Sequence, residues 1–378
     1  MMFYVNPIKT TNIAMAQLKH TMSILVWSCI VLSFSLGLSQ NVSADDNPLA
    51  ELTPKVTSER TSETISLAIL NYENNQLVIA KQHFQAILNQ RPSENVALYY
   101  LGRIAYDQGD AENAILHLRN ALDFKPNTAD EYYWLARAYA DHARSAGAFK
   151  GAILAKNIKK YAERAVESDP KSIHALRLLI DFHLFAPWII GGSTDSAKEN
   201  IDKLANVSVL DADIKRLALM KRLAQTDNAL KAANKLMQTH STSVEALHLA
   251  GLTYQENRLY NEAFRCFDKA LALPLTADST YYLNKVKYRY AETALWSNTN
   301  TQAAIEVLSD LLNSTKNNRK YVRTWPTWTL AKLYLSLGDR SQYRLLRDSL
   351  AKSAIREDDV LNKDIDKFNT LYHKNQGL

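Results

Sequence analysis

The sequence predicts an all-α protein, a right-handed superhelical solenoid of antiparallel helix pairs. Small and bulky apolar residues recur at a spacing of 34 residues, as in the series Ala80-Phe84-Ile87-Pro92 and Ala114-Leu118-Ala121-Pro126. A repeat of that length fits one helix pair, which hides its apolar face against the next pair. The 378 residues include only 10 glycines and 9 prolines, too few for the many turns of a β-rich fold.

The first 44 residues are typical of a signal peptide. Lys9 and Lys19 precede an apolar run over residues 23–38, and Val42-Ser43-Ala44 presents small residues at a cleavage position. The run is shorter than the ~20 residues of a membrane helix, so an uncleaved membrane anchor is the alternative. We therefore expect a periplasmic or otherwise exported protein, with residues 45–60 as a flexible leader.

Charge and cysteine content argue against a nucleic-acid-binding protein and against a fold stabilised by disulfides. Cleavage would remove Lys9 and Lys19 and lower the formal net charge from +6 to +4. That balance is mild, and the sequence contains no basic run dense enough to predict nucleic-acid binding. Only Cys266 would remain after cleavage, so an internal disulfide is not possible.

Eight repeat units are expected between residues 61 and 355, each with a first and a second helix. The clearest are 61–94, 95–128 and 244–277; units 129–172 and 173–209 are longer, 210–243 and 278–318 are weaker, and 319–355 recovers the pattern. Residues 356–378 are expected to form a charged amphipathic helix with a short tail, which caps the open end of the stack.

Residue types within the units explain how the two helices of a pair approach. Small residues at Gly102, Ala136 and Gly251 let the first helix come close to its partner, and Leu118 and Phe267 are expected to fill the gap to the next pair. Prolines end the second helices, because proline lacks an N–H and clashes with the preceding turn. These prolines are Pro92, Pro126 and Pro170. Thr128 and Glu131 form an expected capping box.

These residues and their period resemble the tetratricopeptide repeat. The resemblance implies a concave face, built from the first helices, that binds a protein or peptide partner. Carried over position by position, it implies the following partner-binding residues: Tyr99, Arg103, Tyr106, Tyr133, Arg137, Arg177 and His248. Tyrosine and arginine are frequent anchors of interfaces. In the alternative, the tyrosines fill the seam between repeats and the arginines pair with acids such as Asp107 and Asp141.

The stretch from Phe182 to Leu204 interrupts the pattern with an enlarged turn. Pro187 ends one helix, Gly191-Gly192 can take positive φ, and Ser193 or Thr194 can cap the next helix. We expect residues 188–190 to pack beneath the turn, with an exposed apolar patch for a partner as the alternative. Its Ala-Pro-x-x-x-Gly-Gly-Ser pattern resembles a group of exported bacterial repeat proteins, a resemblance that implies no activity.

The sequence contains few motifs that are typical of catalysis or of metal or cofactor binding. It lacks a His-Glu-x-x-His zinc motif, a Gly-x-Ser-x-Gly elbow and a phosphate-binding loop, so no catalytic residue, metal or cofactor is expected. Cys266 is interpreted as packing. The preferred function is an exported scaffold that binds a protein or peptide. The alternatives are a small-ligand binder or enzyme that uses the turn Pro187–Thr194, or an adaptor that stays membrane-anchored because residues 1–44 are retained.

Overall fold

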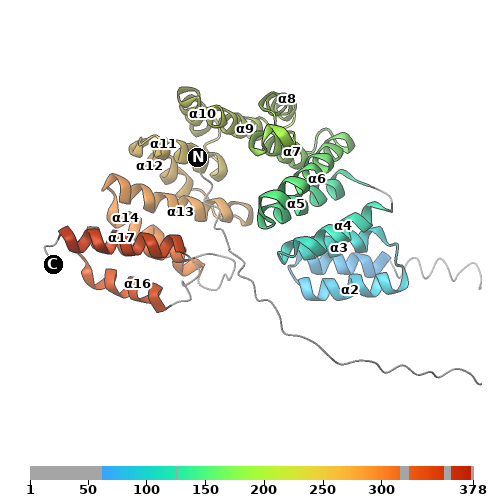
Figure 1. Ribbon diagram of the computed structural model, residues 1–378, viewed down its shortest axis with the longest axis horizontal. Helices are drawn as coiled ribbons and strands as arrows, with labels where there is room; N and C mark the ends of the chain where they lie inside the picture. The colour runs from blue at the N-terminus through green and yellow to red at the C-terminus, as the bar shows by residue number, and fades with distance from the viewer. Residues whose placement is uncertain (1–61, 125–126, 316–322, 353–358, 376–378) are drawn as a thin grey trace, which may run out of the picture. The chain divides into compact units, whose positions relative to one another are not determined.

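The computed structural model describes residues 62–124, 127–315, 323–352 and 359–375, and within these ranges all regular structure is helical (Figure 1). The chain divides into two compact units, one of residues 59–353 and one of both chain ends, 1–58 and 354–378. The predicted signal peptide and leader lie outside the described residues. The predicted all-α solenoid of helix pairs is confirmed in the unit of residues 59–353, which we call the repeat unit.

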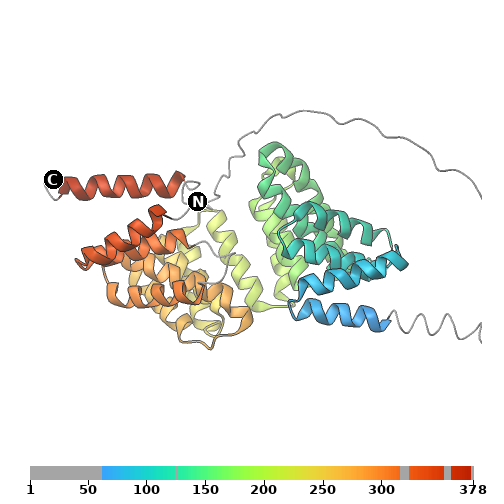
Figure 2. The ribbon, with the colours of Figure 1, turned by 90° about the horizontal axis from the view of Figure 1, so that it is seen from below.

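Eight helix pairs follow one another in the described part of the repeat unit (Figure 2). The first helices are residues 62–73, α3 (Asn95–Asp107), α5 (Ala129–Ser145), α7 (Ile173–Phe185), α9 (Val209–Arg222), α11 (Val244–Glu256), α13 (Ala277–Ser297) and α15 (Thr324–Ser336). The second helices are α2 (Leu77–Gln90), α4 (Ala111–Leu122), α6 (Gly147–Ser168), α8 (Thr194–Ala205), α10 (Thr226–Thr239), α12 (Tyr260–Leu271), α14 (Thr301–Ser314) and α16 (Arg340–Lys352). Each helix pair lies inside the bounds of one expected repeat unit or begins at most one residue before them.

Short polar side chains start many of these helices. Thr128 accepts a hydrogen bond from the Glu131 N–H, and the Glu131 carboxylate accepts one from the Thr128 N–H, so the predicted capping box is present. Single caps satisfy the first N–H groups of α7, α8, α9 and α11 through Ser172, Ser193, Ser208 and Ser243.

Small residues bring the two helices of a pair together, as predicted. A Cβ atom at Gly102 would lie 2.5 Å from Leu118 Cγ, and one at Gly251 would lie 2.8 Å from Phe267 Cδ1. Leu118 and Phe267 are fully buried. Because neither glycine has a side chain, the bulky residue of the second helix occupies that space and closes the core of the pair.

The first helices also pack on one another along the repeat unit. α3 contacts α5, which contacts α7, and the same succession continues through α9, α11, α13 and α15. The second helices of neighbouring described pairs make no contact of that extent. The first helices therefore lie closer together than the second helices, and the face they line, which we call the inner face, is the concave one.

The enlarged turn between α7 and α8 differs from the prediction in two ways. Residues 188–190 form a short 3₁₀ helix, η1 (Trp188–Ile190), in which Trp188 is 85% exposed and Ile189 68% exposed, so these two side chains do not pack beneath the turn, whereas Ile190 is half-buried. Only Gly191 has positive φ, at 99°. Gly192 is required for a different reason, because a Cβ there would overlap the carbonyl oxygen of Ala186.

The described part of the second unit is α17 (Asp359–Asn375), a helix where the sequence predicts one. Its expected role as an end cap stays a prediction. None of the described helices combines the length and the apolar character needed to cross a membrane.

Candidate functional site

The inner face of the second and third pairs carries five of the seven predicted binding residues. Tyr99, Arg103 and Tyr106 lie on α3, and Tyr133 and Arg137 lie on α5. Together with Tyr72 of the first helix and Trp134 of α5 they form one connected group, which we call the aromatic–arginine cluster. Its side chains come from three consecutive first helices, because a 34-residue period places equivalent residues side by side on stacked helices.

Arg103 lies at the centre of the cluster. Its guanidinium carbon is 3.6 Å from the centroid of the Trp134 ring, and its Nη1 donates a 2.8 Å hydrogen bond to the hydroxyl of Tyr99. Burial raises the pKa of Tyr99 to about 12, so this phenol keeps its proton at neutral pH. Among the described residues, the buried Nε atom of Arg103 has no hydrogen-bond partner. Its guanidinium is thus ordered by stacking but only partly satisfied by hydrogen bonds.

Arg137 repeats the arrangement one unit later. Its Nη1 donates to the Tyr133 hydroxyl over 2.9 Å, and its Nη2 donates to the Tyr106 hydroxyl over 2.7 Å. The two phenols come from neighbouring helices, α5 and α3, so Arg137 ties one pair to the next. A phenol oxygen that accepts from an arginine still has its own O–H to donate. The cluster therefore contains two guanidinium groups, of Arg103 and Arg137, that are kept in place by hydrogen bonds and ring contacts, beside phenol groups that can donate.

The alternative pairing of these arginines with Asp107 and Asp141 is wrong. Asp107 instead accepts a 2.7 Å hydrogen bond from the Tyr72 hydroxyl, and Asp141 forms an ion pair with Arg144. The same alternative has the tyrosines fill the seam between repeats. Tyr133 is buried as that predicts, with 7% of the residue exposed. Tyr99, Arg103, Tyr106 and Arg137 are half-buried, so part of each is accessible from the inner face.

Arg177 on α7 belongs to a separate network. Its Nη1 donates to Asp211 over 2.6 Å and its Nη2 to Glu245 over 2.5 Å. Tyr282 donates to the same Glu245 oxygen over 2.7 Å. These residues come from α7, α9, α11 and α13. Arg177 is therefore engaged by carboxylates of its own chain, which leaves less of its donor capacity for a partner.

His248 on α11 is buried, with 4% of the residue exposed, and neither ring nitrogen has a partner among the described residues. Burial lowers the pKa of His248 to about 3, with Lys285 and Arg289 adding to the effect, so the ring is neutral. The structure thus brings Tyr99, Arg103, Tyr106, Tyr133 and Arg137 together and places Arg177 and His248 elsewhere.

Sequence reasoning missed two members of the cluster, Tyr72 and Trp134. Tyr72 stands 34 residues before Tyr106, so the repeat period was the available signal for it. Trp134 stands at no position implied by the resemblance, although the run Tyr132-Tyr133-Trp134 marks an unusual density of aromatic residues. Asp211 and Glu245 were missed as well. Their relation to Arg177 follows the 34-residue spacing, which was the available signal.

The remaining candidates for chemistry lie apart from the cluster. Cys266 is fully buried, and burial raises the pKa of its thiol to about 12. No group of His, Cys, Asp and Glu within the described ranges could hold a metal ion. In the turn, Ser193 already accepts from the Ser196 N–H at the start of α8.

Comparisons with known proteins agree with this architecture. Residues 102–142 match the family model for the TPR repeat, which supports the tetratricopeptide resemblance over that part of the chain. The crystal structure of a tetratricopeptide repeat protein from Parabacteroides merdae aligns with a TM-score of 0.53 at 14% identity, over 73% of this chain and 99% of that one. The yeast Tom70 structure aligns with a TM-score of 0.60 at 15% identity, over 79% of this chain and 60% of that one.

At these identities the likeness to the two structures shows the fold alone. No curated protein matches the sequence. The resemblance of the enlarged turn to exported repeat proteins stays a prediction.

Proposed function

We propose that the protein is a scaffold that binds a protein or an extended peptide on the inner face of its second and third helix pairs. The observation that carries this proposal is the aromatic–arginine cluster, in which tyrosine, tryptophan and arginine side chains from three successive helices are joined by hydrogen bonds and ring contacts and, apart from the buried Tyr133, are half-buried. Arginine and aromatic residues in that state are frequent anchors of interfaces, because little side-chain entropy is lost when a partner binds.

The chemistry of the cluster favours a partner segment with hydrogen-bond acceptors. The phenol groups of Tyr106 and Tyr133 each accept a hydrogen bond from Arg137 and keep an O–H to donate, whereas the Tyr99 O–H donates to Asp130 over 3.5 Å. Backbone carbonyls of an extended peptide present acceptors at regular intervals, and the aromatic rings provide apolar area between the donors. A segment of that kind would lie across α3 and α5.

The proposal includes export, which rests on the sequence of residues 1–44. An adaptor that keeps this segment as a membrane anchor would use the same inner face. Sequencing the N-terminus of the protein isolated from its native cell separates the two: a chain that begins at Asp45 indicates cleavage, and one that begins near Met1 indicates retention.

The test of binding uses a partner identified by crosslinking in the native cell and then purified. We expect Tyr99→Phe combined with Arg103→Gln to weaken its Kd at least tenfold, since both the phenol donor and the stacked guanidinium are removed. The matched control is Arg164→Gln on α6, an exposed arginine of a second helix, which should leave Kd unchanged. Equal affinity for all three proteins, with unchanged helical content, would reject the inner face as the binding surface.

A small ligand at Pro187–Thr194 is the competing proposal. The side chain of Ser193 occupies one of the free N–H groups at the start of α8, which reduces what that helix end can offer an anion. Thermal shifts with added metabolites in the wild type and in Gly192→Val test this competing proposal, because a ligand-dependent shift that is lost in this variant would place a small ligand at the turn, and no shift would count against it.

A further inference from the structure

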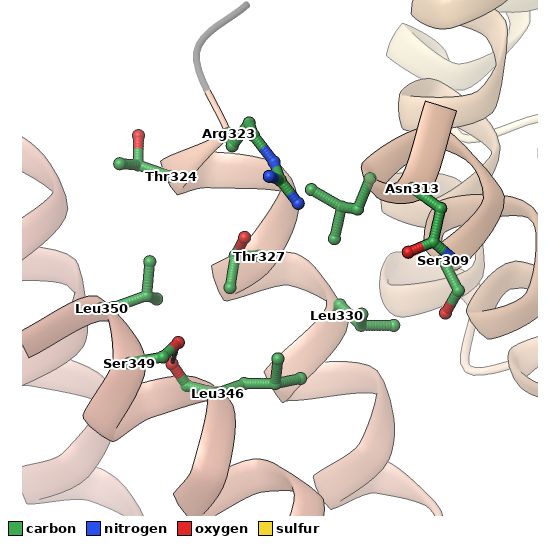
Figure 3. Close-up of a pocket in the computed structure, with 10 residues that line it drawn as sticks. Ser309, Asn313, Arg323, Thr324, Thr327, Leu330, Leu346, Ser349 and Leu350 are labelled. Carbon is green, nitrogen blue, oxygen red and sulfur yellow. Dashed lines mark hydrogen bonds between the residues drawn. The ribbon is translucent and has the colours of Figure 1, made fainter. Parts of the chain in front are cut away.

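A pocket of about 580 Å³ lies between α14, α15 and α16, at the end of the repeat unit farthest along the chain from the aromatic–arginine cluster (Figure 3). Ten residues line it: Ser309, Leu312, Asn313, Arg323, Thr324, Thr327, Leu330, Leu346, Ser349 and Leu350. Its volume is within the range of roughly 300–1,000 Å³ of pockets that hold small molecules.

The lining divides into an apolar and a polar part. Four leucines, two of them on α16, supply the apolar part. Arg323 and Thr324 lie at the start of α15, and Figure 3 shows the Arg323 side chain extending from there into the space between α15 and α14. A ligand that satisfies both parts would have a polar head near the start of α15 and an apolar tail along the leucines.

The polar part favours a negative charge. None of the ten lining residues is acidic, and no described residue forms an ion pair with Arg323. The Arg323 Nε and Thr324 Oγ1 atoms are buried without a hydrogen-bond partner among the described residues. Buried polar atoms are normally paired, so the unpaired Nε of Arg323 favours a ligand that accepts a hydrogen bond from this guanidinium.

The guanidinium of Arg323 supplies the charge at this end of the pocket. Arginine matches a carboxylate in particular, because its planar N–H groups can donate two parallel hydrogen bonds to the two oxygens.

We propose that this pocket binds a monocarboxylate with an apolar chain, its carboxylate held by Arg323 and its chain lying against the leucines. The site lies apart from the inner face, so it is independent of partner binding there. It gives the protein a small-molecule ligand in addition to the proposed protein partner.

Calorimetric titration of the purified protein with decanoate, kept below the concentration at which it forms micelles, tests the proposal. Decanol has the chain without the charge, and acetate has the charge without the chain. We expect decanoate to bind at least tenfold more tightly than either. Equal binding of decanoate and decanol, or no binding of decanoate, would overturn the proposal.

Variants assign the binding to this pocket. Arg323→Gln should reduce decanoate affinity at least tenfold, to the level of decanol, and Arg323→Lys should retain part of it. Leu346→Trp should fill the pocket and abolish binding of both compounds. Arg344→Gln, an exposed arginine on the same α16, is the matched control and should bind decanoate normally. Unchanged decanoate binding in Arg323→Gln and Leu346→Trp would place the ligand elsewhere and reject the assignment.

Discussion

At the scale of single residues, burial decides what a side chain can do. His248 and Tyr99 are each the fifth residue of a first helix, and the sequence therefore treats them as equivalent. Tyr99 is half-buried and hydrogen-bonded to Arg103, whereas His248 is buried without a partner for either ring nitrogen. The same repeat position thus holds an accessible donor in one unit and a neutral core residue in another.

The burial of His248 predicts acid sensitivity. Its pKa is about 3 in the folded protein and ~6.5 in an unfolded chain, so only the unfolded state takes up the proton at intermediate pH. The stability held through this residue is therefore complete above pH ~6.5 and is lost as the pH falls toward 3, by about 2 kcal/mol at pH 5.

We expect His248→Leu to lose less stability than the wild type between pH 7 and pH 5, measured by urea unfolding followed by circular dichroism. His83→Leu on α2 is the control for the substitution itself. If the wild type and His248→Leu lose the same free energy over this interval, the buried neutral histidine does not govern the acid response.

At the scale of the helix pair, a small residue opposite a bulky one sets how closely two helices approach. Gly251 on α11 faces the fully buried ring of Phe267 on α12. The close approach at Gly251 was predicted from its small size, whereas Phe267 was expected to fill the gap to the next pair and instead lies against Gly251, 16 positions away within one repeat. The enlarged turn was predicted less well: the side chains of Trp188 and Ile189 are exposed, and nothing in their apolar character shows whether a neighbouring helix will cover them.

Gly251→Ala should destabilise the protein by about 1–3 kcal/mol, since the added methyl group would overlap the Phe267 ring and force the helices apart. Thermal unfolding measures the loss. In the double variant with Phe267→Leu, which leaves more space, the cost should be smaller than the sum of the two single costs. Additive costs would show that the two side chains do not compete for the same space.

At the scale of the whole repeat unit, Arg177 links helix pairs that are far apart in sequence. Its two carboxylate partners come from the next pair and the one after it, at Asp211 and Glu245. All three side chains are less than one-third exposed. Without the arginine, two partly buried carboxylates would face each other without a counter-charge.

Arg177→Met should therefore destabilise the unit by about 1–3 kcal/mol and increase hydrogen exchange in α7, α9 and α11. Adding Asp211→Asn and Glu245→Gln should restore most of the loss, because the repulsion is removed. The control is Arg289→Met, whose partner Glu292 lies on the same helix and whose loss should cost less than ~1 kcal/mol. Faster exchange throughout the chain, with no rescue, would contradict a local coupling of these pairs.

The repeating pattern of small and bulky side chains was enough to predict the helical class, the succession of helix pairs and the small residues at which two helices approach, because these depend on short spacings along the chain. It also placed Tyr99, Arg103, Tyr106, Tyr133 and Arg137 on one face, since a 34-residue period stacks equivalent positions.

Only the tertiary structure decided how those residues are used. It put Trp134 against Arg103, buried His248, tied Arg177 to two carboxylates and formed the pocket at Arg323. Each of these outcomes depends on how closely neighbouring helices approach and on what solvent they exclude, and the spacing of residues along the chain does not specify either.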